Sequence, residues 1–486
     1  MTGKQRPCCR NQEGRNMIFK KTLAYTITHA WPFHLLALFS IIACQGNNAA
    51  INDNKGMIKL VTLDPGHFHA ALVQKEMYSL VDSVVHIYAP DGNDLALHLE
   101  RIKRYNGRTD SPTQWTEKVY TGTDFFDKMI SEKKGNVVVL SGNNQKKTEY
   151  ILNSLKNGFN VFADKPMVID SEGFEKLRDA FAVAEKNGLL LYDIMTERFE
   201  ITTILQRELS MIPEIFGSLE KGTPENPAIT KESVHHFYKY VSGNVLVRPA
   251  WFMDVAQQGE GIVDVMTHLV DLVQWECFPE QIIDYTKDIS IDSARRWTTS
   301  MSLNEFKTIT GQTSVPAYLQ KNIVADSTLG IYCNGEINYR IKGIHAKTSV
   351  TWNYQAPEGA GDSHHSVMRG TKANLVIRQG KEENYKPVLY IEPTGNDTTF
   401  PANLSKHIAN LNAAYPGISL NKTGSGWMVH IPDKLSEGHE AHFGRVMDKF
   451  LGYLKHKDMP SWEVPNMIAK YFTTTKALDI ALKNKE

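Results

Sequence analysis

Five apolar runs recur between residues 58 and 194 of the 486-residue chain: 58–63, 84–89, 136–141, 159–164 and 188–194. Each run is continuously apolar rather than alternating, which is typical of strands in a parallel sheet covered on both faces. The segments between the runs have helical character. Strands that alternate with helices predict a doubly wound α/β domain, which we place at about residues 57–195.

Two of the intervening helices have predictable limits. One is expected at 145–157 and another at 171–187. In the second, Asp170 and Ser171 are suitable N-terminal caps, and Gly188 is a typical residue just past a helix end.

The pattern changes beyond about residue 201. Alternating stretches such as "KTSVTWNY" and "PVLYIEP" predict strands of an antiparallel sheet, and Asn334-Gly335 predicts a type I′ hairpin inside "TLGIYCNGEINYRI". We therefore expect residues 196–486 to form an α+β domain with a large, mostly antiparallel sheet. A last helix at about 466–483 is expected to pack back on the first domain.

The N-terminal segment has the features of a secretory signal. From Met17 it has two lysines, then an apolar core that ends in "IIAC" at Cys44, too short to span a membrane. The ending resembles a bacterial lipobox, which implies lipidation of Cys44. We therefore expect a signal peptide at 1–44, with 1–16 upstream of the true start, a polar tether at 45–56, and a lipid-anchored, periplasm-facing protein. A fortuitous apolar segment is the alternative.

Charge and cysteine content exclude several classes of protein. The 54 basic and 54 acidic residues balance, which argues against a nucleic-acid partner. Five cysteines cannot supply a disulfide framework, and in the body of the chain only Cys277 and Cys333 could pair. No cluster with zinc spacing occurs, so no metal site is expected.

The first apolar run leads into a tight turn, "LDPGHFHAAL". Gly66 would let the backbone approach a phosphate at the start of the next helix, as in dinucleotide-binding proteins. Asp64, however, stands where the first glycine of the G-x-G-x-x-G pattern belongs. Asp91, after the second run, could accept from an adenosine ribose hydroxyl, which favours NAD over NADP. An ordinary strand-turn-helix is the alternative.

Two further stretches carry ionisable residues in buried surroundings. Lys165 follows the strand "FNVFAD", at the edge where open α/β sheets bind ligands, and a strand-end lysine that reaches solvent is the alternative. In "QQGEGIVDVMTHLVDLVQW" the spacing of Asp264, His268 and Asp271 predicts one face of a buried helix. A general base, His268, oriented by a carboxylate, is one interpretation, and a structural network is the other.

"ADKP", the Asp-x-x-x-His of Asp264 and His268, and "TERF" at 196–199 together resemble the Gfo/Idh/MocA oxidoreductases. "APEGAGDSHHSVMRGTKA" and "GHEAHF" resemble a Bacteroidetes-type branch with a distinctive C-terminal domain. The resemblance implies an NAD(P)-binding Rossmann domain and hydride transfer from a sugar-like carbinol to a nicotinamide.

The resemblance also implies roles for individual residues. Lys165 would hold the substrate hydroxyl and the nicotinamide ribose, His268 would take the hydroxyl proton, and Asp264 would contact substrate or orient His268. The expected cofactor contacts are Gly66, His67, Phe68, Asp91, Ser141, Asn143, Asp164 and Lys165. Substrate contacts are expected from Arg198, His235, His236, Arg248, Trp251 and Asp271.

Because free NAD is scarce outside the cytoplasm, export implies a tightly held cofactor that is recycled in each turnover. The enzyme would then oxidise a sugar, polyol or glycoside, or cleave a glycoside by oxidation, elimination and reduction. A non-catalytic surface protein that binds a carbohydrate or nucleotide is the alternative. We also expect a membrane anchor through lipid and a homo-oligomer contact through the C-terminal sheet.

Overall fold

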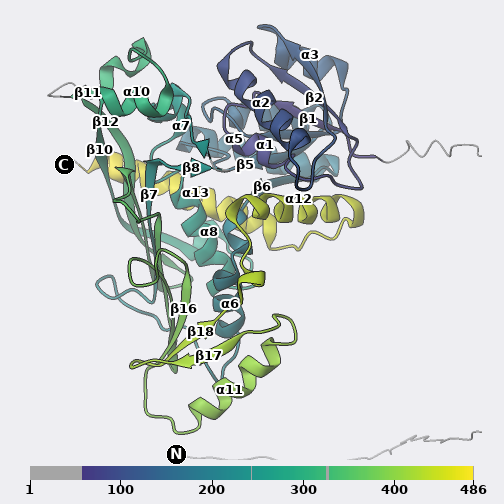
Figure 1. Cartoon of the computed structure of the whole chain (residues 1–486). Coiled ribbons are helices and arrows are strands. Elements are labelled where there is room, and N and C mark those ends of the chain that lie inside the picture. The colour runs from purple at the N-terminus through teal and green to yellow at the C-terminus, as the bar shows by residue number, and fades with distance from the viewer. Residues whose placement is uncertain (1–56, 242–243, 325–327, 485–486) are drawn as a thin grey trace, which may run out of the picture. The chain divides into compact units, whose positions relative to one another are not determined.

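The N-terminal sheet is parallel and six-stranded in the computed structural model, which describes residues 57–241, 244–324 and 328–484. The strands lie in the order β3-β2-β1-β4-β5-β6 (Figure 1). They are β1 (Leu60–Leu63), β2 (Val84–Ala89), β3 (Thr116–Thr121), β4 (Val137–Leu140), β5 (Asn160–Asp164) and β6 (Leu191–Ile194). Every residue of β1, β4 and β6 is buried, as their apolar runs predict. The predicted α/β class is confirmed.

Strand β3 has no counterpart among the predicted strands. Its sequence, "TEKVYT", is polar, and none of its residues is buried because it pairs only with β2 at the edge of the sheet. An edge strand needs no continuous apolar run, so the pattern that identifies the inner strands does not apply to it.

The helices of this region cover the sheet, and α5 begins and ends where its caps predict. The Asp170 carboxylate accepts from the Gly173 N–H, and Gly188 takes a left-handed conformation at the C-terminus. These helices are α1 (His69–Leu72), α2 (Asn93–Gly107), α3 (Phe125–Glu132), α4 (Lys147–Lys156) and α5 (Ser171–Asn187).

The second sheet has ten strands and is antiparallel except where β13 pairs with β7. Its path is β10-β12-β13-β7-β14-β15-β16-β18-β17, with β11 beside β12. The strands are β7 (Ile229–Tyr238), β10 (Ile289–Ser302), β11 (Ile323–Val324), β12 (Thr328–Ile341), β13 (Ile344–Gln355), β14 (Ser363–Arg369), β15 (Ala373–Gln379), β16 (Val388–Pro393), β17 (Ser419–Lys422) and β18 (Trp427–His430). A separate ribbon joins β8 (Tyr240–Val241) to β9 (Asn244–Val245). The predicted mostly antiparallel sheet is confirmed.

The predicted hairpin at Asn334-Gly335 is wrong, because both residues lie inside the continuous strand β12. Gly335 has no side chain that would collide with Ile262, and the Asn334 side chain bonds to the neighbouring strands. The true turn is Lys342-Gly343, where both residues have positive φ and join β12 directly to β13. Close packing, rather than a turn, explains the Asn-Gly pair.

Helices from the second half complete both cores. The long C-terminal helices α12 (His439–His456) and α13 (Glu463–Lys483) run beside the N-terminal sheet (yellow in Figure 1), and Phe443, Phe450 and Tyr471 join its apolar core. Helix α13 packs on α5 of the first domain, so the predicted return of the last helix is observed, and it also packs on β10. The other elements are η1 (Thr196–Phe199), α6 (Ile201–Ser210), η2 (Ala250–Met253), α7 (Val255–Gln258), α8 (Met266–Cys277), α9 (Tyr285–Asp288), α10 (Leu303–Thr310), η3 (Ala317–Asn322), α11 (Phe400–Leu411) and η5 (Asp433–Leu435).

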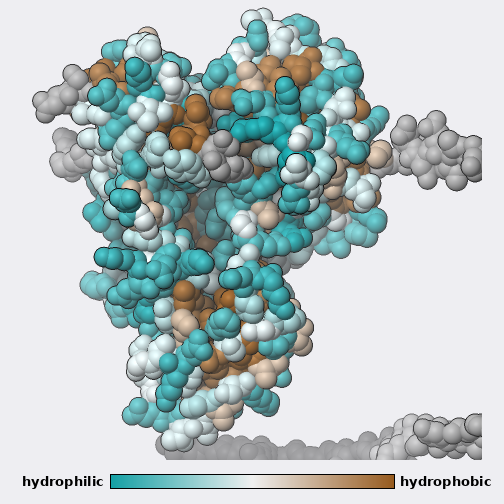
Figure 2. Space-filling model, in the orientation of Figure 1, coloured by the Kyte–Doolittle hydropathy of each residue, from teal (hydrophilic) through white to brown (hydrophobic). Residues whose placement is uncertain are grey.

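One row of charged side chains crosses the second sheet from strand to strand. It consists of ion pairs that link Arg295, Glu336, Lys347, Glu232 and His365. Hydrophobic residues gather elsewhere, over α6 and β18 on the face shown in Figure 2. The expected homo-oligomer contact through this sheet stays a prediction.

The predicted signal peptide, the lipidation site Cys44 and the tether all lie outside the described residues. Among the described helices, none is long and apolar enough to cross a membrane. Cys277 and Cys333, the two cysteines that could have paired, are free thiols.

A buried ion network fixes helices α8 and α13 to the end of the N-terminal sheet. Arg198 pairs with Asp271 at 2.6 Å and with Glu463 at 3.0 Å, and Lys470 pairs with Asp271 at 2.8 Å and with Asp193 at 2.6 Å. The Arg198 and Lys470 cations hold the pKa of Asp271 far below its usual range, against the effect of burial. The network therefore sets the position of α8, whose preceding turn and first residues reach the candidate site.

Replacing Arg198 by Met should destabilise the protein by about 3 kcal/mol or more, because two buried carboxylates lose a charge partner. The matched change Arg295→Met, in the exposed pair with Glu336, should cost less than about 1 kcal/mol. Urea denaturation of both variants measures the difference. Equal losses in the two variants would contradict a structural role for the Arg198 network.

Candidate active site

The turn between β1 and α1 is built without most of the glycines of a dinucleotide fingerprint. Asp64 has φ 48°, in the left-handed region that Asp tolerates better than most residues, so it stands in for the first glycine. Gly142, in the loop after β4, packs so closely that a side chain there would meet the Asp64 carbonyl oxygen. Helix α1 is only one turn long, so the helix N-terminus expected to hold a phosphate is hardly developed.

Gly66 is covered from the other half of the chain. A Cβ atom at Gly66 would lie 2.9 Å from the Trp251 ring and 3.0 Å from an Asp94 oxygen, and Trp251 Nε1 donates to that carboxylate at 2.7 Å. Burial, together with the nearby Asp94 carboxylate, raises the pKa of Asp64 to about 6. Two carboxylates and an indole therefore stand where a pyrophosphate would need space and positive charge.

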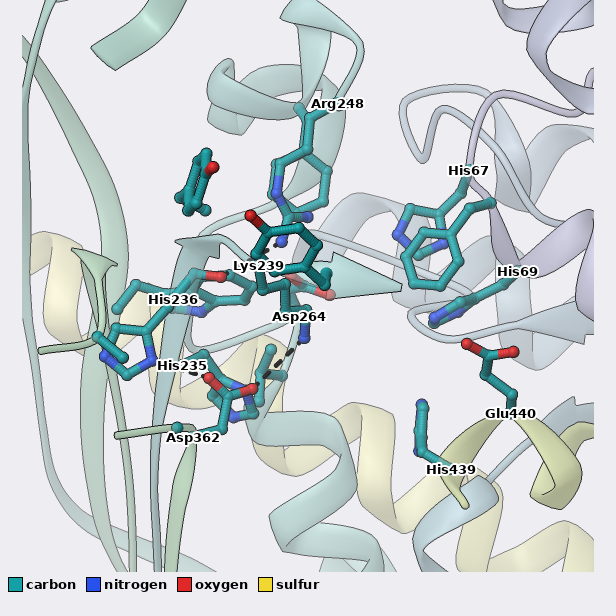
Figure 3. A pocket seen from close by; sticks show the side chains of 18 of the residues that line it. His67, His69, His235, His236, Lys239, Arg248, Asp264, Asp362, His439 and Glu440 are labelled. Atoms are coloured by element: carbon teal, nitrogen blue, oxygen red, sulfur yellow. Dashed lines mark hydrogen bonds and ion pairs between the residues drawn. The ribbon is translucent and has the colours of Figure 1, made fainter. Parts of the chain in front are cut away.

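A cavity of about 840 Å³ opens beside this turn, within the usual size range of small-molecule sites. The N-terminal sheet contributes the β1–α1 turn and the ends of β4 and β5, and the second half contributes β7, the start of α8, the loop at 355–362 and the start of α12 (Figure 3). The cavity therefore lies at the carboxyl ends of the parallel strands, where open α/β sheets bind ligands.

Lys165 and Asp264 meet across the cavity. Lys165 Nζ donates to Asp264 Oδ1 at 2.7 Å, and both side chains are more than nine-tenths buried. Burial alone would raise the pKa of Asp264, but the Lys165 ammonium holds it below its usual value. An amine from the first half and a carboxylate from the second thus share one site, as the sequence predicts.

His268 lines the same cavity but is not oriented by Asp264. Asp264 lies in the turn that precedes α8 and is committed to Lys165, whereas His268 Nδ1 is buried with no hydrogen-bond partner among the described residues. Burial and the Lys165 charge lower the pKa of His268 to about 4. The imidazole is therefore neutral at physiological pH and able to accept a proton. The expected Asp264–His268 hydrogen bond is not present.

Some of the residues expected to bind the cofactor line this cavity, and others lie outside it. Asp164 accepts from Ser141 Oγ and from His69 Nδ1, both at 2.9 Å, and His67 Nδ1 lies 3.5 Å from the same oxygen. His67, Phe68, Asp164 and Lys165 line the cavity. Asn143 instead donates to Gln257 at 2.7 Å, and Asp91 is exposed on the loop after β2.

A histidine-rich group forms the opposite wall (Figure 3). His236 Nδ1 lies 2.8 Å from Asp362, whose other oxygen lies 3.5 Å from His235 and 3.4 Å from Lys239. Burial would raise the pKa of Asp362, but these three neighbours hold it well below its usual range.

The Arg248 guanidinium lies on the same wall. It is buried near the Phe252 and Trp352 rings and donates to the carbonyl oxygens of Phe237 and His236.

The structure places three of the expected substrate contacts outside the cavity lining. Arg198 and Asp271 belong to the buried ion network, where their charges are already paired, so we assign them a structural role. Trp251 covers Gly66. His235, His236 and Arg248 do line the cavity.

Sequence reasoning also missed cavity residues. His69 was not among the expected residues, and it converges with His67 on Asp164 although the two segments are far apart in the chain. Glu197 and His439 form a second pair on the cavity wall, at 3.3 Å. Features of the sequence could have pointed to these residues. His67 and His69 have His-x-His spacing, Glu197 lies in the "TERF" segment, and His439 lies in the "GHEAHF" segment.

Comparisons with known proteins agree with this geometry. Residues 68–192 match the family described as "Oxidoreductase family, NAD-binding Rossmann fold", and residues 205–482 match the "Putative oxidoreductase C terminal domain". The crystal structure of a "putative oxidoreductase" from Parabacteroides merdae is 58% identical, covers 88% of this chain and 98% of its own, and superposes with a TM-score of 0.86. The chain belongs to the Gfo/Idh/MocA family of NAD(P)-dependent oxidoreductases. The predicted family and enzyme class are confirmed.

More distant solved structures share the fold. Levoglucosan dehydrogenase, solved with NADH and levoglucosan, is 11% identical with a TM-score of 0.56 and covers 88% of this chain and 97% of its own. A variant of a 3-ketoreductase from Actinomadura kijaniata, solved with TDP-benzene and NADP, is 13% identical with a TM-score of 0.52 and covers 87% and 98%. The comparison with curated proteins finds no match.

The residues present fit one half of the cofactor that the family uses. The nicotinamide half fits the cavity, where Lys165 and Asn144 could hold it, and Asn144 Oδ1 is buried without a partner among the described residues. The pyrophosphate contact expected at Gly66 is obstructed, because Trp251 and Asp94 lie against that residue. A dinucleotide bound at Gly66 in the usual way would therefore contact Trp251, which η2 carries.

Replacing Trp251 by Ala should strengthen NAD(H) binding by about tenfold or more, because the ligand no longer has to displace the indole. Titration calorimetry on the wild type, on this variant and on the control Trp297→Ala, in β10, measures the change. Weaker binding by Trp251→Ala, with an unchanged melting temperature, would instead make the indole part of the cofactor's binding surface.

Proposed function

We propose that this protein oxidises a hydroxyl-bearing carbon of a sugar, polyol or glycoside, with Lys165, His268 and Asp264 as its catalytic residues. The observation that carries the proposal is their convergence: the Lys165–Asp264 pair and the neutral His268 line one cavity at the carboxyl ends of the parallel strands. Family membership supplies the reaction class, since a bound nicotinamide accepts a hydride from such a carbon.

The roles follow from charge and protonation. Lys165, a buried cation, holds the substrate oxygen and stabilises the negative charge that develops when its proton leaves. His268, neutral because burial and Lys165 lower its pKa, accepts that proton. Asp264 fixes the Lys165 amine and can accept from a neighbouring substrate hydroxyl. These groups act mainly by positioning and by proton transfer.

The cavity suits a ligand rich in hydroxyl groups. Its far wall presents His235, His236, Asp362, Lys239 and Arg248, which offer both donors and acceptors, and the Trp352 ring provides an apolar surface beside them. A few placed polar groups on an apolar background are typical of sites that orient a small polar molecule. We take levoglucosan dehydrogenase, a related fold with a sugar-derived ligand, as support for this substrate class.

A second candidate reaction is the cleavage of a glycoside by transient oxidation, elimination and reduction. Elimination needs a further acid–base pair besides His268, and Glu197 with His439 occupies the cavity wall near it. A non-catalytic binding protein is less well supported, because it has no need for a buried amine and a neutral imidazole on one cavity.

The cellular setting is part of the proposal. Export with a lipid anchor at Cys44 would give the protein a periplasmic substrate and would require a cofactor that stays bound between turnovers. The covered Gly66 is consistent with slow exchange, since η2 must move before a dinucleotide can enter or leave. NAD is proposed over NADP because an acidic residue, Asp91, follows β2.

Replacing Lys165 by Ala should lower kcat by about 100-fold or more while ligand affinity changes less, because the lost contacts act mainly on the developing charge. The assay follows NADH formation over a panel of sugars, polyols and glycosides. The control is Lys186→Ala, at the exposed end of α5. A binding protein would show no turnover in the wild type and would keep its ligand affinity in both variants.

The pH profile should report the buried His268. With a pKa near 4, the base stays neutral, and kcat/KM should be level above about pH 5 and fall below about pH 4. An exposed histidine would place this fall near pH 6.5. The groups that act on His268 are Lys165, Glu197, His439 and Asp164.

The variant His268→Gln should have a much lower kcat/KM, and its pH profile should no longer show the fall at acidic pH. Circular dichroism over the same pH range shows whether the fold persists. A limb near pH 6.5, or a limb that survives in His268→Gln, would contradict the role of this residue as the base.

A further inference from the structure

We propose that His67, His69 and Asp164 bind a divalent transition-metal ion of the zinc class on the wall of the cavity. One ligand atom from each of the three side chains lies within 4.8 Å of the others. The two histidines come from the β1–α1 turn, and the aspartate ends β5. The set therefore stands where the glycine-rich loop of a dinucleotide site would face its ligand.

The distances between the ligand atoms of the three side chains are close to those of a metal site. In a tetrahedral zinc site the bonds are about 2.0–2.2 Å long, so ligand atoms lie about 3.4 Å apart. Here the two Nδ1 atoms lie 2.9 Å and 3.5 Å from the same oxygen, Asp164 Oδ2. All three ligand atoms lie within 4.8 Å of one another, so side-chain adjustment of about 1 Å would bring them around one centre.

The chemistry of the donors is also suitable. Two imidazoles and one carboxylate are a common set for zinc and related metals, with the remaining coordination position open. Ser141 Oγ donates to Asp164 Oδ2 and fixes the carboxylate, as outer residues of metal sites do. His67 Nδ1 is buried and has no hydrogen-bond partner among the described residues, a cost that a metal bond would remove.

A plain hydrogen-bond network explains only part of this arrangement. His69 and Ser141 already donate to Asp164 Oδ2, so the approach of a second Nδ1, from His67, adds no hydrogen bond. Two cations lie near this group. Lys147 Nζ donates to the Asp164 carbonyl oxygen at 3.1 Å, and Lys165, on the cavity wall, is paired with Asp264 and so opposes a metal ion less than a free amine would. The approach of the unpartnered His67 Nδ1 to Asp164 therefore favours an ion shared by the two imidazoles.

The open position of this site would face the cavity, because His67, His69 and Asp164 all line it. Figure 3 shows His67 and His69 pointing toward the space that His439 and Glu440 border from α12. A ligand oxygen, from a hydroxyl or carbonyl group or from water, could complete the coordination there. Metal binding can be measured without cofactor or substrate.

The test is metal binding by untagged, chelator-treated protein. Zn²⁺ titration calorimetry, and the visible absorption of Co²⁺ as a probe of imidazole coordination, should show one ion per chain. His67→Gln and His69→Gln should each weaken binding by roughly 100-fold or more, since each removes a direct ligand. His86→Gln, a histidine in β2 away from the cavity, should bind as the wild type does.

Each result decides the proposal. Wild-type protein that binds neither ion, or only as weakly as His67→Gln does, would overturn it, and this outcome does not depend on any variant folding. Loss of binding in His86→Gln equal to that in His69→Gln would overturn it too. Melting curves of the metal-free variants separate a lost ligand from a lost fold, and Asp164→Asn repeats the test from β5. The proposed oxidoreductase activity can fail while metal binding persists, and the reverse.

Discussion

The ion pair between Lys165 and Asp264 joins the two halves of the protein across the cavity. Two buried charges cost several kcal/mol to desolvate, and only close geometry offsets that cost. The turn before α8 must therefore sit within hydrogen-bond reach of the end of β5. Asn143 and Asn144 strengthen this contact through bonds to Gln257 and Gln258, and the Arg198 network holds the far part of α8. His268 reaches the cavity because these constraints position its helix.

The turn after β1 shows how a family fold can keep its topology while its ligand surface changes. Asp64 supplies the left-handed backbone that glycine normally gives, and α1 is shortened to one turn. Trp251 and Asp94 cover Gly66, and His69 stands where the last glycine of the usual pattern belongs. The sheet, the strand-end lysine and the crevice persist, since they depend on packing rather than on the loop. The residues of the β1–α1 turn can therefore differ without disturbing the sheet, and they can bind a different ligand.

The sequence predicts the parts of the fold that repeat a strong local pattern. Inner strands and the capped helix α5 follow from apolar runs and end residues, and the Lys165 position follows from its place after a buried strand. Strand β3 has no such pattern at its exposed edge. Asn334-Gly335 looks like a turn, yet it serves close packing against Ile262, a tertiary contact that no local signal reveals. Likewise, Arg198 and Asp271 are ionic residues in apolar surroundings, and only their partners Glu463 and Lys470 show that they are structural.

The central claim is that one cavity, shared by Lys165, Asp264 and His268, is the place of reaction. A crystal structure of the protein grown with NADH and a sugar-like ligand tests it most directly. We expect the nicotinamide ring and a ligand hydroxyl to lie between Lys165 and His268, with Trp251 displaced from Gly66. Ligand density in another part of the molecule, with this cavity holding only solvent at saturating ligand, would contradict the claim.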